Sequence, residues 1–414
     1  MAVTPECGGS EPSLSVAEAR KTLLETLNPV TGWERVPVRS ALGRILAQVL
    51  TAPFDVPAHD NCAMDGFAVR AADLTDTENR LRLVGTAFAG AAFSGRVGPG
   101  EAVRVMTGAV LPEGADTVMI QESARVEMES VVLPACDRPG QNLRRAGEDI
   151  AAGRPALPAG RQIGPAELGL IASLGLAEIP VYRRPRVAFF STGDELASVG
   201  RPLAPGEVYD SNRYTLHGAL TRLGLDVMDL GVVRDDPDDL ERTFAEAASQ
   251  ADLIITTGGV SVGEADYIRP ILSRLGDVHF WRIAIKPGRP MAFGRLGGAW
   301  FFGLPGNPVA VLVCFYQIVQ DALQRLQGLD PIPPRPSFRV PCDSAIRKDP
   351  GRREFPRGWL YQEGAAWRVR LSGNQGSGVL SSMTEANCFI CLPEESASVS
   401  PGDPVEVQPF AGIL

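Results

Sequence analysis

The chain has 414 residues, of which 44% are hydrophobic and 21% are charged. This length predicts two to four domains with an ample core, and the composition is that of a globular protein rather than a disordered or fibrous one. The formal net charge of −9 excludes a general nucleic-acid-binding protein, because such proteins carry a basic patch or a high pI.

The cysteines and histidines exclude several kinds of site. Seven cysteines, an odd number, are scattered along the chain, which is typical of reduced thiols in a cytoplasm rather than of a disulfide framework or a zinc site. The three histidines, His59, His217 and His279, lie too far apart to indicate a catalytic triad or a histidine zinc site. The longest purely apolar run, 309–316, is far shorter than a membrane span, and no secretory signal is evident. We therefore expect a cytoplasmic protein without a membrane partner.

The first half of the chain mixes helical and β-like segments. Residues 1–13 read as a disordered tail. Ser15 and Glu18 form a capping-box pattern that opens a helix to about Leu27, and a second short helix is expected over 40–46. Short β-like runs at 102–106, 117–121 and 131–133 lie between Gly/Pro turns, and helical patterning returns at 165–174. The simplest interpretation is a discontinuous helical domain, 14–50 and 144–182, interrupted by an inserted β-rich domain, 51–143.

The second half reads as an α/β domain followed by a small β domain. Apolar runs at 187–190, 227–230, 253–255, 278–285 and 300–302 alternate with helical segments, which indicates a parallel-rich sheet covered by helices over 183–330. Asp236 and Pro237 are typical of a helix start, and the helix is expected to run to Ser249. The segment PIPPRP, 331–336, reads as a stiff linker. Turn-rich alternation over 331–414 predicts a small C-terminal β-barrel.

Chemically interesting loops follow the predicted strands of the α/β segment. They are STGDEL at 191–196, VRDDP at 233–237, TTGGVSVGEADY at 256–267, KPGRP at 286–290 and LPGNP at 304–308. Because open α/β sheets bind ligands at the carboxyl ends of their strands, we expect these loops to converge at one edge. A glycine turn between a strand and a helix suits an anion, and acids in the same loop indicate a phosphate ligand with a metal ion.

Each of these groups also has a plainer interpretation. The TTGG segment alone could be a glycine-rich connector that Asp266 caps, and Thr192 or Asp194 could cap a helix. Asp235 or Asp236 could be a solvated helix start. Lys286 and Arg289 could be surface charges, although their charge also suits a polyanion, with Arg the better bidentate phosphate ligand.

The motifs AMDGFAV, TGAVLPEGAD, GEDI, STGDEL, TTGGVSVGEADY, KPGRP, LPGNPV and GNQGSGVLSSM occur in this order across nearly the whole chain. Together they resemble the molybdopterin molybdenumtransferase family, to which the C-terminal part of gephyrin also belongs. The resemblance implies the domains 14–50 plus 144–182, 51–143, 183–330 and 331–414. It also implies an elongated homodimer with a shared site.

The implied reaction cleaves the pyrophosphate of adenylylated molybdopterin with Mg²⁺ or another divalent cation, inserts molybdate at the dithiolene and releases AMP. Molybdate and tungstate are both tetrahedral dianions of nearly equal size, so the resemblance admits either. Further partners that it implies are the adenylyltransferase of the pathway and the molybdoenzymes that receive the cofactor.

The family's functional positions carry over onto motif residues of this chain. The resemblance implies catalytic acids at Glu195, Asp235, Asp266, Asp65 and Asp149, with Glu195, Asp235 and Asp266 as metal ligands. It implies, together with the loop pattern, that substrate is bound by Thr107, Thr192, Gly258, Gly259, Ser261, Lys286, Arg289, Pro305, Gly306, Asn307, Pro308 and Ser377.

One basic segment departs from the family pattern. Where relatives often show WKxxxKPGKP, this chain has WRIAIKPGRP, with Arg282 and Arg289 in place of lysines. The positive charge is kept, but a point-like contact becomes a forked one.

Two alternative functions remain beside molybdate insertion. The first is an adenylyltransferase that makes adenylylated molybdopterin, which the extra domains disfavour. The second is a non-catalytic scaffold, which would not need the acids.

Overall fold

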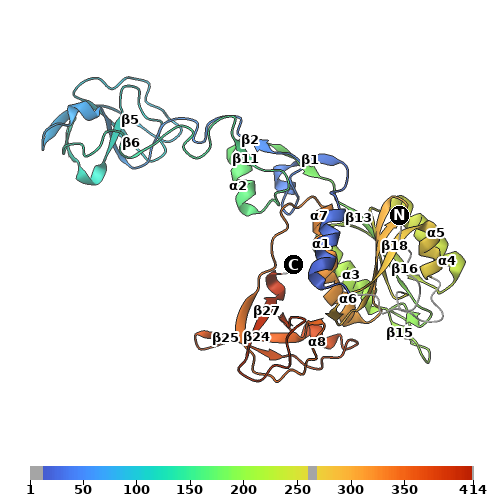
Figure 1. Ribbon diagram of the computed structural model, residues 1–414. Helices are drawn as coiled ribbons and strands as arrows, with labels where there is room; N and C mark the ends of the chain where they lie inside the picture. Colours follow the sequence, from blue (N-terminus) through green and yellow to red (C-terminus); the bar gives the residue numbers. More distant parts are fainter. Residues whose placement is uncertain (1–12, 260–267, 413–414) are drawn as a thin grey trace, which may run out of the picture. The chain divides into compact units, whose positions relative to one another are not determined.

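A computed structural model describes residues 13–259 and 268–412. The chain divides into two compact units (Figure 1). One unit consists of residues 35–181, and the other combines residues 1–34 with residues 182–414.

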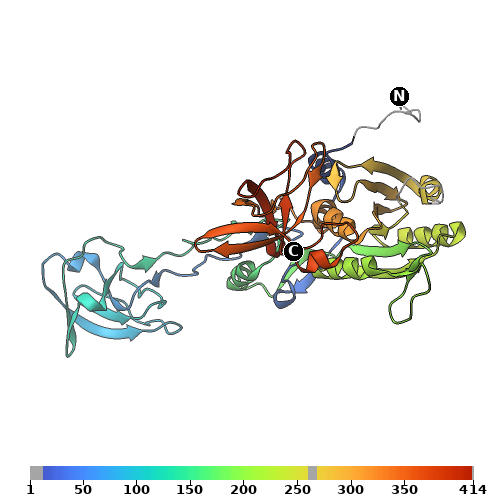
Figure 2. The ribbon, with the colours of Figure 1, turned by 90° about the horizontal axis from the view of Figure 1, so that it is seen from below.

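The unit 35–181 is built around a six-stranded sheet (Figure 2, blue to cyan). Its strand order is β7 (Thr117–Ile120), β4 (Gly66–Val69), β6 (Glu101–Val105), β5 (Asn79–Ala87), β9 (Ser130–Leu133) and β8 (Arg125–Glu127). Neighbouring strands are antiparallel except β5 and β6, which are parallel. The predicted β runs at 102–106, 117–121 and 131–133 are confirmed.

The rest of this unit contains less helix than its sequence indicates. Helix α2 (Pro165–Ser173) is present, with the proline at its start. Two short antiparallel pairs join β3 (Asn61–Cys62) to β10 (Leu143–Arg144) and β2 (Leu50–Thr51) to β11 (Pro155–Leu157). The helix expected over 40–46 is wrong: a 3-10 turn, η1 (Val38–Ser40), comes before it instead. Gly43 adopts φ +77°, and Ile45 and Leu46 form β-bridges, so the segment cannot continue as a helix.

The other unit contains a six-stranded mixed sheet in the order β16, β13, β17, β21, β20, β18. Strands β16 (Asp226–Val233), β13 (Arg186–Thr192), β17 (Leu253–Thr257) and β21 (Ala299–Leu304) are parallel. Strand β20 (Pro290–Leu296) is antiparallel to both β21 and β18 (Gly276–Arg282). Strand β18 therefore runs in the same direction as the four parallel strands.

Helices cover both faces of this sheet (Figure 1). Alternate strand residues point to opposite faces of the sheet and therefore belong to two hydrophobic cores. In the first core, Phe189 and Ile255 pack with α1 (Val16–Thr26) and α3 (Ser211–Arg222). Phe190 and Ile254 pack with α4 (Pro237–Gln250) and α5 (Ile268–Leu275). The predicted capping box of Ser15 and Glu18 is present, as is the predicted start of α4 with Asp236 as its N-cap.

A long buried helix runs from Pro308 to Leu326 and packs in the same core as α1 and α3. It consists of α6 (Pro308–Cys314), a π-helical turn, η4 (Phe315–Val319), and α7 (Gln320–Leu326). By length and composition this is the one helix among the described residues that could cross a membrane, but 83% of its apolar window is buried inside the protein. We therefore interpret it as a core helix.

The C-terminal part is a five-stranded antiparallel sheet in the order β22, β27, β26, β24, β25. The strands are β22 (Phe338–Pro341), β24 (Arg357–Glu363), β25 (Ala366–Leu371), β26 (Cys388–Cys391) and β27 (Pro404–Pro409). A bridge between Cys342 and Val369 brings the end of β22 to β25, which curls the sheet toward a half-barrel. The multidomain fold, α/β with separate β-rich parts, agrees with the predicted fold class.

Two cysteines in this sheet have the CxxC spacing of many metal sites and redox sites. Cys388 and Cys391 are three positions apart in β26, so their side chains point to opposite faces of the strand. Both are buried, and burial raises the pKa of each thiol to about 12. These thiols are therefore inert core residues.

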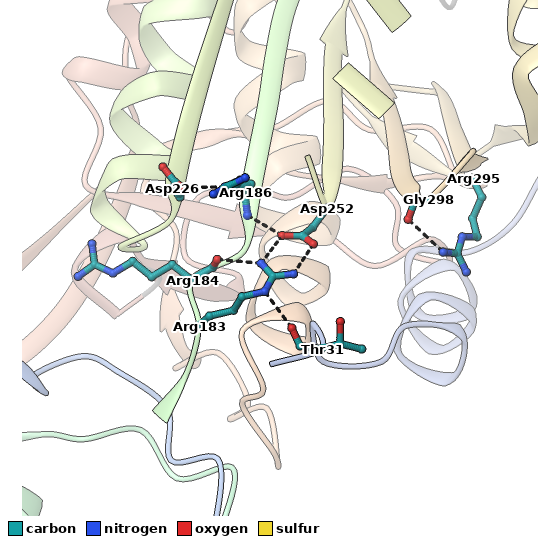
Figure 3. A network of polar contacts seen from close by, with 8 residues as sticks. All are labelled: Thr31, Arg183, Arg184, Arg186, Asp226, Asp252, Arg295 and Gly298. Atoms are coloured by element: carbon teal, nitrogen blue, oxygen red, sulfur yellow. Dashed lines mark hydrogen bonds and ion pairs between the residues drawn. The ribbon is translucent and has the colours of Figure 1, made fainter. Parts of the chain in front are cut away.

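An ion pair joins the start of the α/β sheet to the segment before it (Figure 3). The Arg183 guanidinium donates two hydrogen bonds of 2.7 Å to the Asp252 carboxylate and one of 2.9 Å to the Thr31 carbonyl. The Arg186 N–H donates to the same carboxylate at 2.8 Å. Burial raises the pKa of Asp252, but these hydrogen bonds outweigh burial and leave the pKa below its usual value.

Replacing Asp252 with Asn should lower the free energy of unfolding by about 2 kcal/mol at pH 7, because two charge-assisted bonds are lost. Since the pKa of Asp252 is depressed in the folded state, its contribution to the free energy of unfolding is present above the ordinary aspartate pKa of about 3.9. This contribution is lost as the pH falls through the folded-state pKa. Urea unfolding at several pH values measures this. The matched control is Asp226→Asn, because Asp226 forms an exposed pair with Arg186 at 3.2 Å. Equal effects of the two variants at pH 7 would contradict the assignment.

Candidate functional site

The sheet topology brings the five predicted loops to one edge. The carboxyl ends of β16, β13, β17, β21 and β18 all lie at this edge because these strands run in the same direction. The segment 286–290 joins it because β20 starts where β18 has ended. The predicted convergence is therefore confirmed for the described parts of these loops, which for the loop after β17 end at residue 259, and this edge is where the fold favours a ligand site.

A cavity of about 880 Å³ opens at this edge. The glycine loop after β17, the basic loop before β20, the proline loop after β21 and two C-terminal segments all line it. The predicted binding residues in its wall are Gly258, Gly259, Lys286, Arg289, Pro305, Gly306, Asn307 and Ser377. The volume is in the range of small-molecule and cofactor sites.

The cavity wall is strongly basic although the chain is acidic overall. Among the described residues its basic side chains are Lys286, Arg289, Arg347, Arg352 and Arg357, and its one acidic side chain is Glu354. Such an excess of cations concentrates anions, and guanidinium groups bind the oxygens of oxyanions in a forked geometry. The cavity therefore suits a ligand with several negative charges.

Arg357 is the most buried of these cations. It is 2% exposed, and burial lowers its pKa to about 10, so it remains protonated at neutral pH. It donates to the hydroxyl of Ser382 at 3.0 Å and to the carbonyls of Asn374 and Gly376 at 3.1 Å. Within the described part of the chain it forms no ion pair. A buried, uncompensated guanidinium favours binding of an anion.

Lys286 is tied to the C-terminal part of the chain. Strands β19 (Ile285–Lys286) and β23 (Arg353–Glu354) pair in parallel, and the Lys286 Nζ lies 3.1 Å from the Glu354 carboxylate. Glu354 is 5% exposed, whereas the Lys286 side chain is about half exposed. The pair therefore fixes the ammonium group at the cavity while leaving it accessible to a ligand.

The glycine loop needs its glycines for steric reasons. Gly258 adopts φ +89°, and a Cβ there would lie 2.6 Å from the backbone oxygen of Thr192. Thr192 is 4% exposed, and its hydroxyl is buried without a hydrogen-bond partner in the described residues. Thr192 therefore lies directly behind the loop. Two predicted binding residues, Thr192 and Pro308, the first residue of α6, are not among the residues that line the cavity. Ser261 lies outside the described residues.

The acids occupy the other end of the same edge. Glu195 follows β13 and Asp235 follows β16, and both are exposed. The backbone N–H of Asp235 lies 3.4 Å from the Asp194 carboxylate, so the two loops are in contact. Neither acid lines the cavity. In the strand order β17 separates β13 and β16, which precede the acids, from β21, which precedes the proline loop of the cavity. Asp266 lies outside the described residues.

Three further predicted residues belong to the unit 35–181. The Asp65 carboxylate accepts hydrogen bonds of 2.7 Å from both the backbone N–H and the hydroxyl of Thr107. These two bonds lower the pKa of Asp65 below its usual value. Asp149 is exposed on the segment after β10. The structure therefore brings Asp65 and Thr107 together.

Sequence reasoning missed Arg347, Arg352 and Arg357 as cavity residues. The segment 347–357 carries five basic residues in eleven positions around a Pro-Gly turn, and that density was a usable signal. What the sequence does not indicate is the pairing of β23 with β19, which brings this segment to the α/β edge.

Comparisons with known proteins agree with this architecture. Residues 14–175 match the family described as MoeA N-terminal region (domain I and II), residues 188–325 match the one described as probable molybdopterin binding domain, and residues 339–410 match MoeA C-terminal region (domain IV). The molybdopterin biosynthesis moeA protein from Pyrococcus horikoshii OT3 superposes with a TM-score of 0.83 at 28% identity, covering 96% of this chain and 100% of that one.

Two curated relatives extend the match over nearly the whole sequence. The molybdopterin molybdenumtransferase of Haemophilus influenzae is 44% identical over 403 residues, 97% of this chain and 100% of the relative. That of Nostoc sp. is 36% identical over 93% of this chain and 90% of the relative. The chain therefore belongs to the molybdopterin molybdenumtransferase family.

Arg289 gives a direct test of the basic cavity. Arg289→Ala should weaken the binding of molybdate by at least about tenfold, because a hydrogen bond to a charged group contributes roughly 1.5–3 kcal/mol. The melting temperature should change little, since the side chain is exposed. Isothermal titration calorimetry measures the affinity. The control is Arg339→Ala in β22, an exposed arginine that does not line the cavity. Equal affinity of Arg289→Ala and the parent would show that Arg289 is only a solvated charge.

Proposed function

We propose that the chain inserts molybdate into adenylylated molybdopterin, with divalent-cation-dependent cleavage of the pyrophosphate and release of AMP. The observation that carries this proposal is the basic cavity at the carboxyl edge of the α/β sheet, with the acids Glu195 and Asp235 in loops at the same edge. Family membership supplies the substrate class, since its relatives are molybdopterin molybdenumtransferases.

The basic cavity suits the oxyanions of this reaction. Molybdate is a dianion, so it needs cationic groups or N–H donors rather than carboxylates. Lys286 and Arg289 provide exposed cations, and Arg357 provides a buried cation without an ion-pair partner among the described residues. Ser377, Gly306 and Asn307 add polar backbone and side-chain atoms to the same wall. We assign these residues to binding and orienting molybdate and the phosphate oxygens.

The acids fit a divalent cation. Glu195 and Asp235 are exposed on adjoining loops, and carboxylate oxygens are the ligands that Mg²⁺ prefers. Within the described residues no three His, Cys, Asp or Glu side chains form a group that could hold a metal, so the third ligand in this proposal is Asp266, outside them. A bound cation would neutralise charge on the pyrophosphate oxygens during cleavage. In that cleavage a water oxygen bonds to one phosphorus and the P–O bond to the bridging oxygen breaks.

The separation of acids from cations suits one elongated substrate. Its pyrophosphate would lie near the acids while its dithiolene sulfurs reach the basic cavity, where molybdate is held. Carboxylates next to molybdate would repel it. Glu195 and Asp235 follow strands on the other side of β17 from the proline loop, and the Glu354 carboxylate in the wall is paired with Lys286. We also propose four domains, 14–50 plus 144–182, 51–143, 183–330 and 331–414.

The remaining acids lead us to propose a homodimer. Asp65, Thr107 and Asp149 belong to the unit 35–181, whereas the basic cavity belongs to the other unit. A two-fold dimer allows the site of one subunit to be completed by residues of its partner. A permanent homodimer of this kind should bury more than roughly 2,000 Å² in total.

The central test of the proposed reaction is AMP release from adenylylated molybdopterin with and without molybdate. Asp266→Ala should reduce the rate at least about a hundredfold, since a group that stabilises transition-state charge contributes a few kcal/mol. The control is Asp238→Ala, an exposed acid in the first turn of α4. Wild-type turnover by Asp266→Ala at limiting Mg²⁺ would rule out its assigned role. Formation of adenylylated product from molybdopterin and ATP would instead identify an adenylyltransferase.

Subunit mixing tests the shared site. Asp65→Ala and Asp266→Ala should each be inactive, but their heterodimers should contain one intact site and regain part of the activity if the two acids act across the interface. AMP release is measured after conditions that exchange subunits, and exchange itself is checked by mass spectrometry of differently tagged chains. Proven exchange without recovery would place both acids in the site of one subunit.

A further inference from the structure

Asn212, a residue that carries no role in the proposed reaction, contacts the proline loop at the cavity. It is the second residue of α3, it is 8% exposed, and its Nδ2 donates a hydrogen bond of 2.7 Å to the Gly306 carbonyl. Gly306 lies between Pro305 and Asn307, and all three line the cavity. Asn212 itself does not line it, so it reaches this loop from behind.

The planarity of the peptide bond gives this contact a consequence for the loop. The Gly306 carbonyl and the Asn307 N–H belong to one peptide unit, and in a trans peptide they point in opposite directions. The bond to Asn212 draws the carbonyl toward α3 and therefore turns the Asn307 N–H away from α3. Because Gly306 and Asn307 line the cavity and Asn212 does not, we infer that the side of the loop away from Asn212, and with it the Asn307 N–H, faces the cavity.

The start of α3 is in turn fixed to the strand ends. The Asp210 carboxylate caps α3 by accepting from the Arg213 N–H at 3.2 Å and also accepts from the Ser191 hydroxyl at 3.0 Å. The Ser191 and Thr257 hydroxyl oxygens are 2.9 Å apart at the carboxyl ends of β13 and β17. Asn212 is therefore held at a defined place relative to the cavity edge.

Only one end of the Asn212 amide has a hydrogen-bond partner among the described residues. Its Oδ1 is buried without a hydrogen-bond partner in the described residues. An unsatisfied buried carbonyl is costly, and an apolar side chain of similar size would avoid that cost. What an apolar side chain would lose is the bond to Gly306.

We propose that Asn212 is a positioning residue for anion binding: it orients the Gly306–Asn307 peptide so that the Asn307 N–H serves as an oxyanion donor at the cavity. This inference rests on the proposed binding of oxyanions in the cavity. It extends that proposal to a residue outside the cavity wall, which acts through the backbone of the loop.

The test uses a substitution of equal size. Asn212→Asp replaces the amide donor with a carboxylate oxygen that repels the Gly306 carbonyl. The matched control is Gln327→Glu, because the Gln327 Nε2 donates a hydrogen bond of 2.8 Å to the Leu223 carbonyl. Leu223 caps the other end of α3, about 17 Å from Asn212 along the helix, and does not line the cavity. The two variants make the same chemical change in two side chains that donate to backbone carbonyls, one from the first turn of α3 and one to the residue that caps its other end.

Two measurements distinguish the proposed positioning role of Asn212 from a general destabilisation of the protein. Without any ligand, hydrogen exchange of peptides that cover 304–311 should be faster in Asn212→Asp than in Gln327→Glu. Calorimetry with molybdate should show affinity about tenfold weaker in Asn212→Asp alone, the effect of one lost hydrogen bond. Melting temperatures of both variants record any shared destabilisation of α3.

The outcomes decide the proposal. Faster loop exchange and weaker molybdate binding in Asn212→Asp, with Gln327→Glu like the parent, support it. Unchanged loop exchange or unchanged molybdate affinity in Asn212→Asp overturns it, as does an equal loss of affinity in both variants. If the parent protein binds no molybdate, the proposed function fails, while the exchange measurement still decides whether Asn212 holds the loop.

Discussion

The common direction of five strands in the α/β sheet is the constraint on which the rest of the site depends. Because β16, β13, β17, β21 and β18 all end at one edge, five loops from distant parts of the sequence meet there. The antiparallel strand β20 does not disturb this arrangement, since it begins at the edge where β18 ends. The order of the strands then decides what each part of the edge can do. The loops after β16 and β13, at one end of the sheet, carry the acids Asp235 and Glu195, and the loops after β17, β21 and β18 carry glycines, rigid prolines and cations.

The C-terminal part of the chain turns this edge into a cavity. The short pairing of β19 with β23 brings a second group of arginines to the basic loop and sets Glu354 against Lys286. Arg357 is buried with only neutral partners among the described residues, so its charge is left to attract a ligand. A chain with a net charge of −9 thus contains a positively charged cavity. The electrostatic field in the cavity is set by the side chains placed there rather than by the net charge of the chain.

Much of this architecture follows from local sequence patterns. Buried parallel strands read as apolar runs, and helix starts such as Asp236–Pro237 have local signals, so the α/β segment and its loops were predictable. Strand β20 was missed because Pro290 and Gly294 read as breakers, and the helix expected at 40–46 was wrong because Gly43 and the bridges of Ile45 and Leu46 impose another conformation. The cavity arginines and the contact of Asn212 with Gly306 depend on long-range pairing, which no local pattern indicates.

The central claim is that the basic cavity binds the oxyanion that the proposed reaction consumes. The most direct test is anomalous X-ray diffraction at the molybdenum absorption edge from crystals soaked in molybdate. The account predicts an anomalous peak inside the cavity, within hydrogen-bonding distance of at least one of Lys286, Arg289 and Arg357. Anomalous peaks confined to other surfaces, with an empty cavity at a molybdate concentration that saturates binding in solution, would contradict it.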